Sequence, residues 1–464
     1  MSKLNIGFIT GVSGTDDWML ALCSELKNRV DFEPYFIANM HRSVTFLLKH
    51  NIPKKSVDNI SNGILRGEKC PIKNPNLEYL SKAEKKYGFI ISDAWNISVQ
   101  RFDNRYKIPR KTLLCWFEYG IRKFEAFFKK NKLDYLVSYG PASYIMVLLY
   151  QIAKYYNVKI LELTFSMLPN RFTIKDSLGN NWITLESEYN KLKTRKLTKK
   201  EIKLADEVID LVHNKPADCL RKYNEPLTSK IKKYIHYADL VIRHGARPDL
   251  RYYLWRVRAK YYNHLFEMPK KHEKFVFFPL HYQPEISTSL YGKWWENQIN
   301  LIQCISKALP VDYRLYVKEH PADYGRRPFH FAKEIKKLSN VRLIHPKADA
   351  RKLIRRSSLI LTITGTAGWE AMLLRKPVIV FGDTFYSLLK DVTKLENIED
   401  LPKIIKNKLD VEGDLDRLRK FLVAIVNASY PGLARLPGGC NNYSLRKENI
   451  SLLVDGLVKQ INRG

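Results

Sequence analysis

The stretch from Ser357 to Gly382, SSLILTITGTAGWEAMLLRKPVIVFG, constrains the fold of this chain more than any other. Its apolar run from Leu359 to Ile363 is rich in β-branched residues and nearly unbroken, which is typical of a parallel strand covered on both faces. The helix that follows ends before Pro377, because proline cannot continue it. Val378 to Phe381 then re-enter the sheet, so the stretch predicts one right-handed βαβ unit.

The turn between this strand and its helix reads Thr364-Gly365-Thr366-Ala367-Gly368. Its two glycines permit positive φ and a close backbone approach, and its two threonines offer hydroxyl groups. The start of the helix directs N–H groups at the same spot, which favours an anion. We therefore predict a phosphate site at Thr364, Gly365 and Thr366. A turn that only joins strand to helix is the alternative, and the turn by itself does not decide between the two.

Length and charge limit the remaining possibilities. The 464 residues are too many for one hydrophobic core, so two domains are expected, and the 45% hydrophobic content excludes a disordered chain. Lys and Arg number 79 against 47 Asp and Glu, which gives a net charge of +32. Such a surface attracts nucleic acid, anionic lipid or sugar phosphates, although a general lysine bias of the genome would also produce it.

Six widely spaced cysteines without a CxxC pair indicate neither a zinc site nor a disulfide framework. We predict no metal and no cofactor. The N-terminus leads directly into a strand and lacks the apolar region of a signal peptide, and no apolar run approaches the ~18 residues of a spanning helix. These features predict a cytoplasmic protein and leave open a peripheral contact with the inner face of a membrane.

Strand and helix patterns alternate in the first part of the chain, which predicts a Rossmann-like, doubly wound parallel sheet over residues 1–181. A Gly-rich loop after the first strand leads to Asp16 and Asp17 at the mouth of a helix, where capping is the commonest role of such residues. The expected strands are Asn5–Thr10, Pro34–Ala38, Gly88–Asp93, Asp134–Tyr139 and Val158–Thr164.

Residues 182–270 are rich in Lys, Arg and Tyr in helical patterns, and we interpret them as a basic helical connector. Such a segment could lie on lipid headgroups or stack on bases, but a solvated helical face is the commoner meaning. A second Rossmann-like domain is predicted over 271–400, followed by C-terminal helices over 401–464.

Three polar clusters, HYQPE, KEHP and TGTAGWE, each follow a predicted strand of the second sheet. A histidine before proline is held in an extended backbone, and its imidazole can donate to a phosphate. A single histidine is more often structural, but three clusters on one sheet edge favour a nucleotide site, in which Lys318 adds charge and Glu370 accepts ribose hydroxyls. The predicted binding residues are His281, Gln283, Lys318, His320, Pro321, Thr364, Gly365, Thr366 and Glu370.

The segments FFPLHYQPE, YVKEHP and LTITGTAGWEAMLLRKPVIVFG resemble capsule or surface polysaccharide biosynthesis proteins, a group that includes the KpsC- and KpsS-like CMP-Kdo transferases. The resemblance implies a GT-B glycosyltransferase, with two Rossmann-like sheets facing across a cleft, that transfers a sugar from a nucleotide donor, CMP-linked, to a glycan or lipid-linked acceptor. It also implies that His320, Pro321, Thr364 and Thr366 hold the CMP phosphate, and that Gln283-Pro284 matches the family's QP motif. The first half of the chain shares only the alternating architecture.

The catalytic base is less constrained. Asp16 or Asp17 on the acceptor side are the candidates, with Glu285 as the alternative from the donor side. The DxD pattern at Asp414–Asp416 lies in a charged helical stretch, and we assign it no metal. Two functions of other classes remain: a nucleotide-sugar 2-epimerase of the same fold, and a nucleic-acid-binding protein. The second accounts for the charge but not for the three polar clusters, so nucleic acid is the disfavoured partner.

Overall fold

The computed structural model describes residues 3–11, 15–60, 69–102, 108–140, 143–214, 257–434 and 443–463. The chain forms two compact units. Unit 1 comprises residues 1–195 and 423–464, and unit 2 comprises residues 196–422. This division differs from the predicted boundaries, because the first unit continues beyond residue 181 and the C-terminal helices are shared between the units. The chain returns to unit 1 within helix α17 (Leu415–Asn427).

Unit 1 is built on a seven-stranded sheet with the order β13-β6-β5-β4-β1-β2-β3. Strands β1 to β5 are parallel, whereas β6 and β13 pair in antiparallel fashion at one edge. The strands are β1 (Leu4–Thr10), β2 (Phe32–Ala38), β3 (Val57–Asn59), β4 (Tyr135–Ser138), β5 (Lys159–Phe165), β6 (Arg171–Lys175) and β13 (Tyr430–Pro431).

Unit 2 is built on a six-stranded sheet with the order β12-β11-β10-β7-β8-β9, and all of its neighbouring strands are parallel. The strands are β7 (Phe275–Pro279), β8 (Arg314–Lys318), β9 (Val341–Ile344), β10 (Leu359–Thr362), β11 (Val378–Val380) and β12 (Val392–Lys394). Read from β9, the chain order matches that of the doubly wound dinucleotide-binding fold, and unit 1 follows the same order through β5. The predicted architecture of two Rossmann-like sheets is confirmed.

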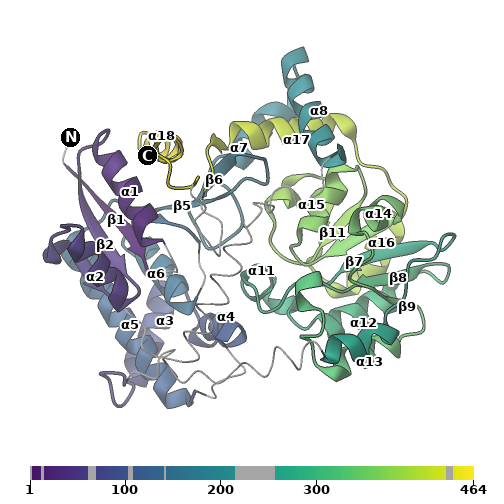
Figure 1. The fold of residues 1–464 in the computed structure, drawn as a ribbon, viewed down its shortest axis with the longest axis horizontal. Helices are drawn as coiled ribbons and strands as arrows, with labels where there is room; N and C mark the ends of the chain where they lie inside the picture. The colour runs from purple at the N-terminus through teal and green to yellow at the C-terminus, as the bar shows by residue number, and fades with distance from the viewer. Residues whose placement is uncertain are drawn as a thin grey trace. The chain divides into compact units, whose positions relative to one another are not determined.

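Helices cover both sheets (Figure 1). In unit 1 they are α1 (Asp16–Lys27), α2 (His41–Lys49), α3 (Leu77–Tyr87), α4 (Ile91–Phe102), α5 (Arg110–Asn131), α6 (Tyr144–Tyr155), α7 (Leu185–Lys193) and α18 (Lys447–Ile461). In unit 2 they are α8 (Lys199–Asn214), α11 (Ile286–Ser289), α12 (Gln298–Ala308), α13 (Phe329–Lys336), α14 (Ala350–Arg356), α15 (Thr366–Leu373) and α16 (Leu401–Lys408).

The core of unit 2 positions the polar loops. Leu359 and Leu361 of β10 pack with α12, α13 and α16 on one side of the sheet, and the intervening Ile360 is fully buried as well. Helix α15 contacts β10 and β11, and its Trp369 and Met372 are buried. A strand buried on both faces therefore leads into a buried helix, as the apolar run predicts.

One predicted strand is wrong. Residues Gly88–Asp93 do not form a strand, because Gly88 ends α3 in a left-handed conformation (φ 70°) and α4 begins at Ile91. The apolar Phe89 and Ile91 that suggested a strand are instead buried at this helix junction.

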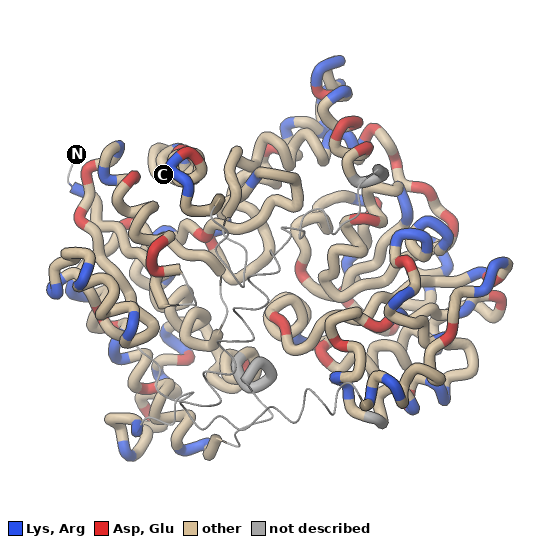
Figure 2. Tube along the Cα trace, in the orientation of Figure 1, with Lys and Arg blue, Asp and Glu red and all other residues tan. Residues whose placement is uncertain are grey.

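Of the predicted connector, the structure describes α7, α8 and residues 257–270, while 215–256 lie outside the described residues. Figure 2 shows Lys and Arg over both units, interspersed with Asp and Glu. Within the described part of the chain, no helix is both long and apolar enough to span a bilayer.

Candidate nucleotide site at the carboxyl ends of β7, β8 and β10

The three polar clusters lie together on one edge of the unit 2 sheet. Strands β10, β7 and β8 are adjacent, and β7 and β10 flank the point where the chain order reverses, where ligands bind in doubly wound folds. The Thr364 N–H donates to His281 Nε2 (3.2 Å), and the Thr364 hydroxyl donates to the Ser287 carbonyl (2.9 Å). The Gln283 N–H donates to the Asp323 carboxylate (2.9 Å), which joins the loop after β7 to the loop after β8.

His281 is a buried link between the loops. Burial lowers the pKa of its imidazole to about 3, with further lowering from Arg327 and His320, so the ring is neutral at physiological pH. Its Nε2 accepts the Thr364 N–H, so the proton of the neutral ring belongs on Nδ1. His281 therefore positions the turn after β10.

The turn after β10 is held without positive φ. Gly365 is the N-cap of α15 with φ −70°, and Gly368 lies within the helix, so neither residue uses the positive φ that glycine permits. Their role is steric: a Cβ on Gly365 would stand 2.7 Å from Thr362 Oγ1 and 3.1 Å from His281 Nε2. The exposed Thr366 begins α15, and the amides of Thr366 and Ala367 have no acceptor among the described residues. This helix start presents one hydroxyl and two N–H groups to an anion.

Replacing Gly365 by Val should abolish nucleotide binding. The side chain would separate Thr362 from His281 and displace the start of α15, because two of its neighbours lie within van der Waals distance of the new Cβ. Isothermal titration with the nucleotide checks the affinity, and a thermal melt checks folding. Gly179, where a Cβ would meet only Ser177 Oγ at 3.6 Å, is the control position. Unchanged affinity in a folded Gly365→Val variant would show that the turn does not contact ligand.

His320 caps the short helical turn Pro321–Asp323 that follows β8. Its Nδ1 accepts the Ala322 N–H (3.2 Å), which places the proton of the neutral ring on Nε2. Pro321 fixes the chain directly after it, and the Tyr282 ring lies 5.8 Å from the His320 ring. The predicted donor therefore has a fixed tautomer and an orientation set by its neighbours.

Lys318 and Glu370 occupy less accessible positions than the phosphate hypothesis expects. Lys318 is buried, its ammonium donates to the Pro346 carbonyl (3.0 Å), and burial lowers its pKa. Glu370 faces Arg351 of α14, with a carboxylate oxygen 3.7 Å from the guanidinium. Both side chains thus have protein partners, and their proposed contact with a ligand stays a prediction.

Arg327 joins the loops after β7 and β8, and sequence reasoning missed it. Its buried guanidinium donates to Glu319 (3.0 and 3.1 Å) and to the His281 carbonyl (2.6 Å), and lies 3.3 Å from the Asp323 carboxylate. It also lies 3.5 Å from the Gln283 side-chain oxygen, whose amide nitrogen donates to the Glu296 carbonyl. The signal in the sequence is weak, because Gly-Arg-Arg-Pro reads as an exposed basic turn.

The candidate bases have different surroundings. In unit 1 the Asp16 carboxylate accepts the Gly11 N–H (2.8 Å) and the Ser43 hydroxyl (3.0 Å), and Asp17 accepts the Trp18 N–H (2.8 Å). In unit 2 the Glu285 carboxylate accepts the Ser287 hydroxyl (2.9 Å). Asp16 thus stabilises the loop after β1, which is a common structural role for a residue at a helix start.

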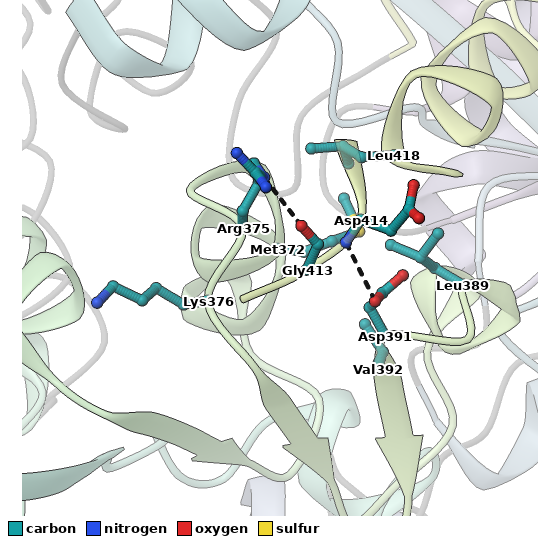
Figure 3. A pocket seen from close by; sticks show the side chains of 9 residues that line it. All are labelled: Met372, Arg375, Lys376, Leu389, Asp391, Val392, Gly413, Asp414 and Leu418. Atoms are coloured by element: carbon teal, nitrogen blue, oxygen red, sulfur yellow. Dashed lines mark hydrogen bonds between the residues drawn. The ribbon is translucent and has the colours of Figure 1, made fainter. Parts of the chain in front are cut away.

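The described residues contain no group of three or more His, Cys, Asp or Glu arranged to hold a metal ion. Asp414 and Asp416 pair with Arg417 (3.4 Å) and Lys420 (3.0 Å) respectively. A small pocket near Asp414 lies at the far end of α15, lined by Arg375, Asp391 and Leu418 among others (Figure 3). Its volume of about 10 Å³ suffices for about one water molecule, so it cannot hold a nucleotide.

Comparison with known proteins shows that the segment carrying the three loops is similar to one described family. Residues 212–401 match the family described as "Capsule polysaccharide biosynthesis protein", which confirms the resemblance stated above. Protein FixF of Sinorhizobium fredii is 28% identical over 120 residues, which are 25% of this chain and 28% of FixF. The matched region is therefore a minor part of that relative.

Solved structures with a similar chain course were also found. KpsC of Thermosulfurimonas dismutans, a beta Kdo 2,7 transferase, is 13% identical, with 72% of this chain and 89% of that chain covered and a TM-score of 0.38. UDP-GlcNAc 2-epimerase of Neisseria meningitidis bound to UDP-GlcNAc is 14% identical, with 99% and 100% covered and a TM-score of 0.31. S. aureus MnaA with UDP is 14% identical, with 99% and 97% covered and a TM-score of 0.31.

Proposed function

We propose that this chain, which matches the capsule polysaccharide biosynthesis family over residues 212–401, is a glycosyltransferase that moves a sugar from a nucleotide donor to a glycan or lipid-linked acceptor. The observation that carries the proposal is the start of α15. There an exposed Thr366 and two amides that have no acceptor among the described residues are held beside the loops after β7 and β8 by the contact between His281 and Thr364. The donor is a CMP-sugar, in keeping with the resemblance noted above.

The chemistry fits a leaving group with one phosphate. A nucleoside monophosphate needs its charge stabilised as the glycosidic bond breaks, and preorganised donors can do this. His320 Nε2–H, the Thr366 hydroxyl and the amides of Thr366 and Ala367 are those donors. Lys318 adds positive charge behind them, and Glu370 takes the ribose hydroxyls. In this scheme transfer needs no divalent ion.

The base that deprotonates the acceptor hydroxyl is a carboxylate, with Asp16, Asp17 and Glu285 as candidates. Amide variants of each separate the roles, because loss of a base lowers kcat while donor affinity stays. If Asp16→Asn lowers the thermal stability in addition to kcat, the role of Asp16 is structural. Its carboxylate would then stabilise the loop at Gly11, where it accepts two hydrogen bonds.

The other functions predict different behaviour. A nucleotide-sugar 2-epimerase would convert its nucleotide sugar without any acceptor. A nucleic-acid-binding protein would bind single- or double-stranded probes at physiological salt, which the three convergent loops do not require. Peripheral attachment to the inner face of a membrane is part of our proposal for the transferase, because its acceptor would be built there.

A thermal-shift panel of CMP, UDP, GDP and ADP tests the proposal. Ligand that binds the folded state stabilises it by about 2.7 kcal/mol at 100 times Kd, so CMP should raise Tm by several degrees and the others by less. The CMP shift should be the same with EDTA present, as should transfer from the CMP-sugar. A shift with UDP or GDP that disappears with EDTA and returns with Mg²⁺ would overturn both the donor class and the metal-free scheme.

A further inference from the structure

A hollow of about 300 Å³ opens on unit 1, away from the carboxyl ends of its strands. It is lined by Phe128, Lys129, Lys132, Leu133, Tyr156 and Val158. Lys132 and Leu133 precede β4, and Val158 precedes β5, so the hollow lies at the amino-terminal edge of the sheet. It is therefore separate from the loops that follow the strands.

A continuous row of aromatic rings leads from the hollow to the surface. The rings of Phe128 and Tyr156 stack at 5.8 Å, Tyr156 meets Tyr155 at 5.4 Å, and Tyr155 meets Tyr87 at 5.1 Å. Tyr155 is 50% exposed, and Ile90, three residues after Tyr87, is 63% exposed. Both residues therefore expose much of a large side chain to solvent.

Lysines border this row. Among the described residues, no carboxylate lies within ion-pair distance of Lys129 or Lys132. Lys86 lies over the Tyr155 ring, 4.9 Å from its centroid, and also pairs with Glu125. Lys132 ends α5 in the left-handed region (φ 43°), a conformation that glycine or asparagine adopts at lower cost. We call Lys86, Ile90, Lys129, Lys132, Tyr155 and Tyr156 the lysine–aromatic surface.

We propose that the lysine–aromatic surface binds an anionic lipid bilayer, with a lipid phosphate between Lys129 and Lys132. Lysines without acidic partners attract the negative headgroups, and aromatic rings with an exposed aliphatic side chain settle at the boundary between headgroups and acyl chains. A free sugar phosphate would use the two lysines but not Ile90 and Tyr155. The surface lies on unit 1 and involves no residue of the proposed nucleotide site. It rests on the membrane attachment that the proposed function includes, but vesicle binding is measured without nucleotide, so its failure would leave the nucleotide site untouched.

The test is co-sedimentation of the full chain with vesicles of phosphatidylcholine alone and of phosphatidylcholine containing about 30% phosphatidylglycerol. The parent should bind the anionic vesicles and lose most binding at about 500 mM NaCl, because salt screens exposed charges. Lys129→Glu with Lys132→Glu should weaken binding at least tenfold, given that each surface lysine contributes about a factor of five. Ile90→Ser should remove the binding that persists at high salt.

The matched control is Lys200→Glu with Lys203→Glu on α8, two exposed lysines in unit 2 that belong to the predicted connector. This control should bind as the parent does. Equal loss in both double variants, or no loss in the Lys129/Lys132 variant, would overturn the proposal. If soluble polygalacturonate displaces the protein from the vesicles, and if its own binding needs Lys129 and Lys132, the surface binds an acidic glycan instead. Thermal melts confirm folding, and the milder Lys129→Gln with Lys132→Gln replaces any variant that does not fold.

Discussion

Arg327→Met should lower the stability of the protein by about 3–5 kcal/mol and abolish nucleotide binding. The guanidinium is buried between two carboxylates, Glu319 and Asp323, which are 4% and 2% exposed. Removing it leaves two buried negative charges without their counter-charge, and it also removes the shorter of two hydrogen bonds to the His281 carbonyl, the other coming from Gln298. The loops after β7 and β8 would then lose their shared anchor. Urea unfolding followed by far-UV circular dichroism measures the loss.

Arg419→Met is the matched control for this variant. Arg419 makes a bidentate pair with Asp206 (both 2.8 Å), but both side chains are partly exposed, so its loss should cost about 1 kcal/mol or less. If Arg327→Met destabilises no more than Arg419→Met, the buried cluster does not hold the loops. Combining Arg327→Met with Glu319→Gln should recover part of the loss, because one uncompensated charge is removed.

The same cluster gives the stability a pH dependence. Burial raises the pKa of Asp323 to about 6, although Arg327 opposes the rise. The folded protein therefore holds this proton more tightly than the unfolded chain, whose aspartates titrate near 3.9. The resulting stabilisation is complete below that value and is lost as pH rises through about 6. Asp323→Asn should reduce the difference in Tm between pH 4 and pH 7. If this difference is the same in the variant as in the parent, other groups cause the pH dependence.

The fold could be predicted because its signals are local. The run around β10 is apolar on both faces, and Pro377 fixes the end of the helix that follows, so the βαβ unit needs no tertiary information. The antiparallel β6 and β13 carry no such signal, since β13 is two residues long and is defined by its partner. The strand predicted at Gly88–Asp93 was wrong because a short apolar run after a glycine is as typical of a helix junction as of a strand.

The site was only partly predictable for a similar reason. Polar residues after strands could be located, because the carboxyl ends of parallel strands share one edge. What each side chain does there depends on burial, which spacing does not show: His281 is neutral and internal, while Thr366 is exposed. Arg327 gave only a weak signal. Asp323 lies four residues away, but Glu319 (8 residues away) and His281 (46 residues away) are brought to it by the fold.

His320→Ala should reduce transfer by about 10²–10³-fold while the protein stays folded, the usual cost of removing one donor to developing charge. The residue is partly exposed at the end of β8, and its Nδ1 hydrogen bond to the Ala322 N–H directs the Nε2 proton away from that cap. Turnover of the nucleotide sugar whose base the panel identifies measures the effect, with nucleotide affinity measured in parallel.

The chain contains its own control for His320, because a second His-Pro pair follows the neighbouring strand β9. His345 Nδ1 accepts the Lys347 N–H (3.0 Å), as His320 Nδ1 accepts the Ala322 N–H, and His345 Nε2 is bonded to Asn263 Oδ1 (2.9 Å). His345→Ala should therefore leave transfer within about twofold of the parent, since it removes a cap and no ligand donor.

A variant that keeps the cap separates the two roles of His320. In His320→Asn the side-chain oxygen can still accept the Ala322 N–H, because asparagine is a favoured capping residue, but the Nε2 donor is gone. If His320 acts as a donor, His320→Asn is as inactive as His320→Ala. If transfer returns in His320→Asn, or if His345→Ala loses as much activity as His320→Ala, the His-Pro pair serves the backbone alone, and the phosphate must be held by the start of α15 without it.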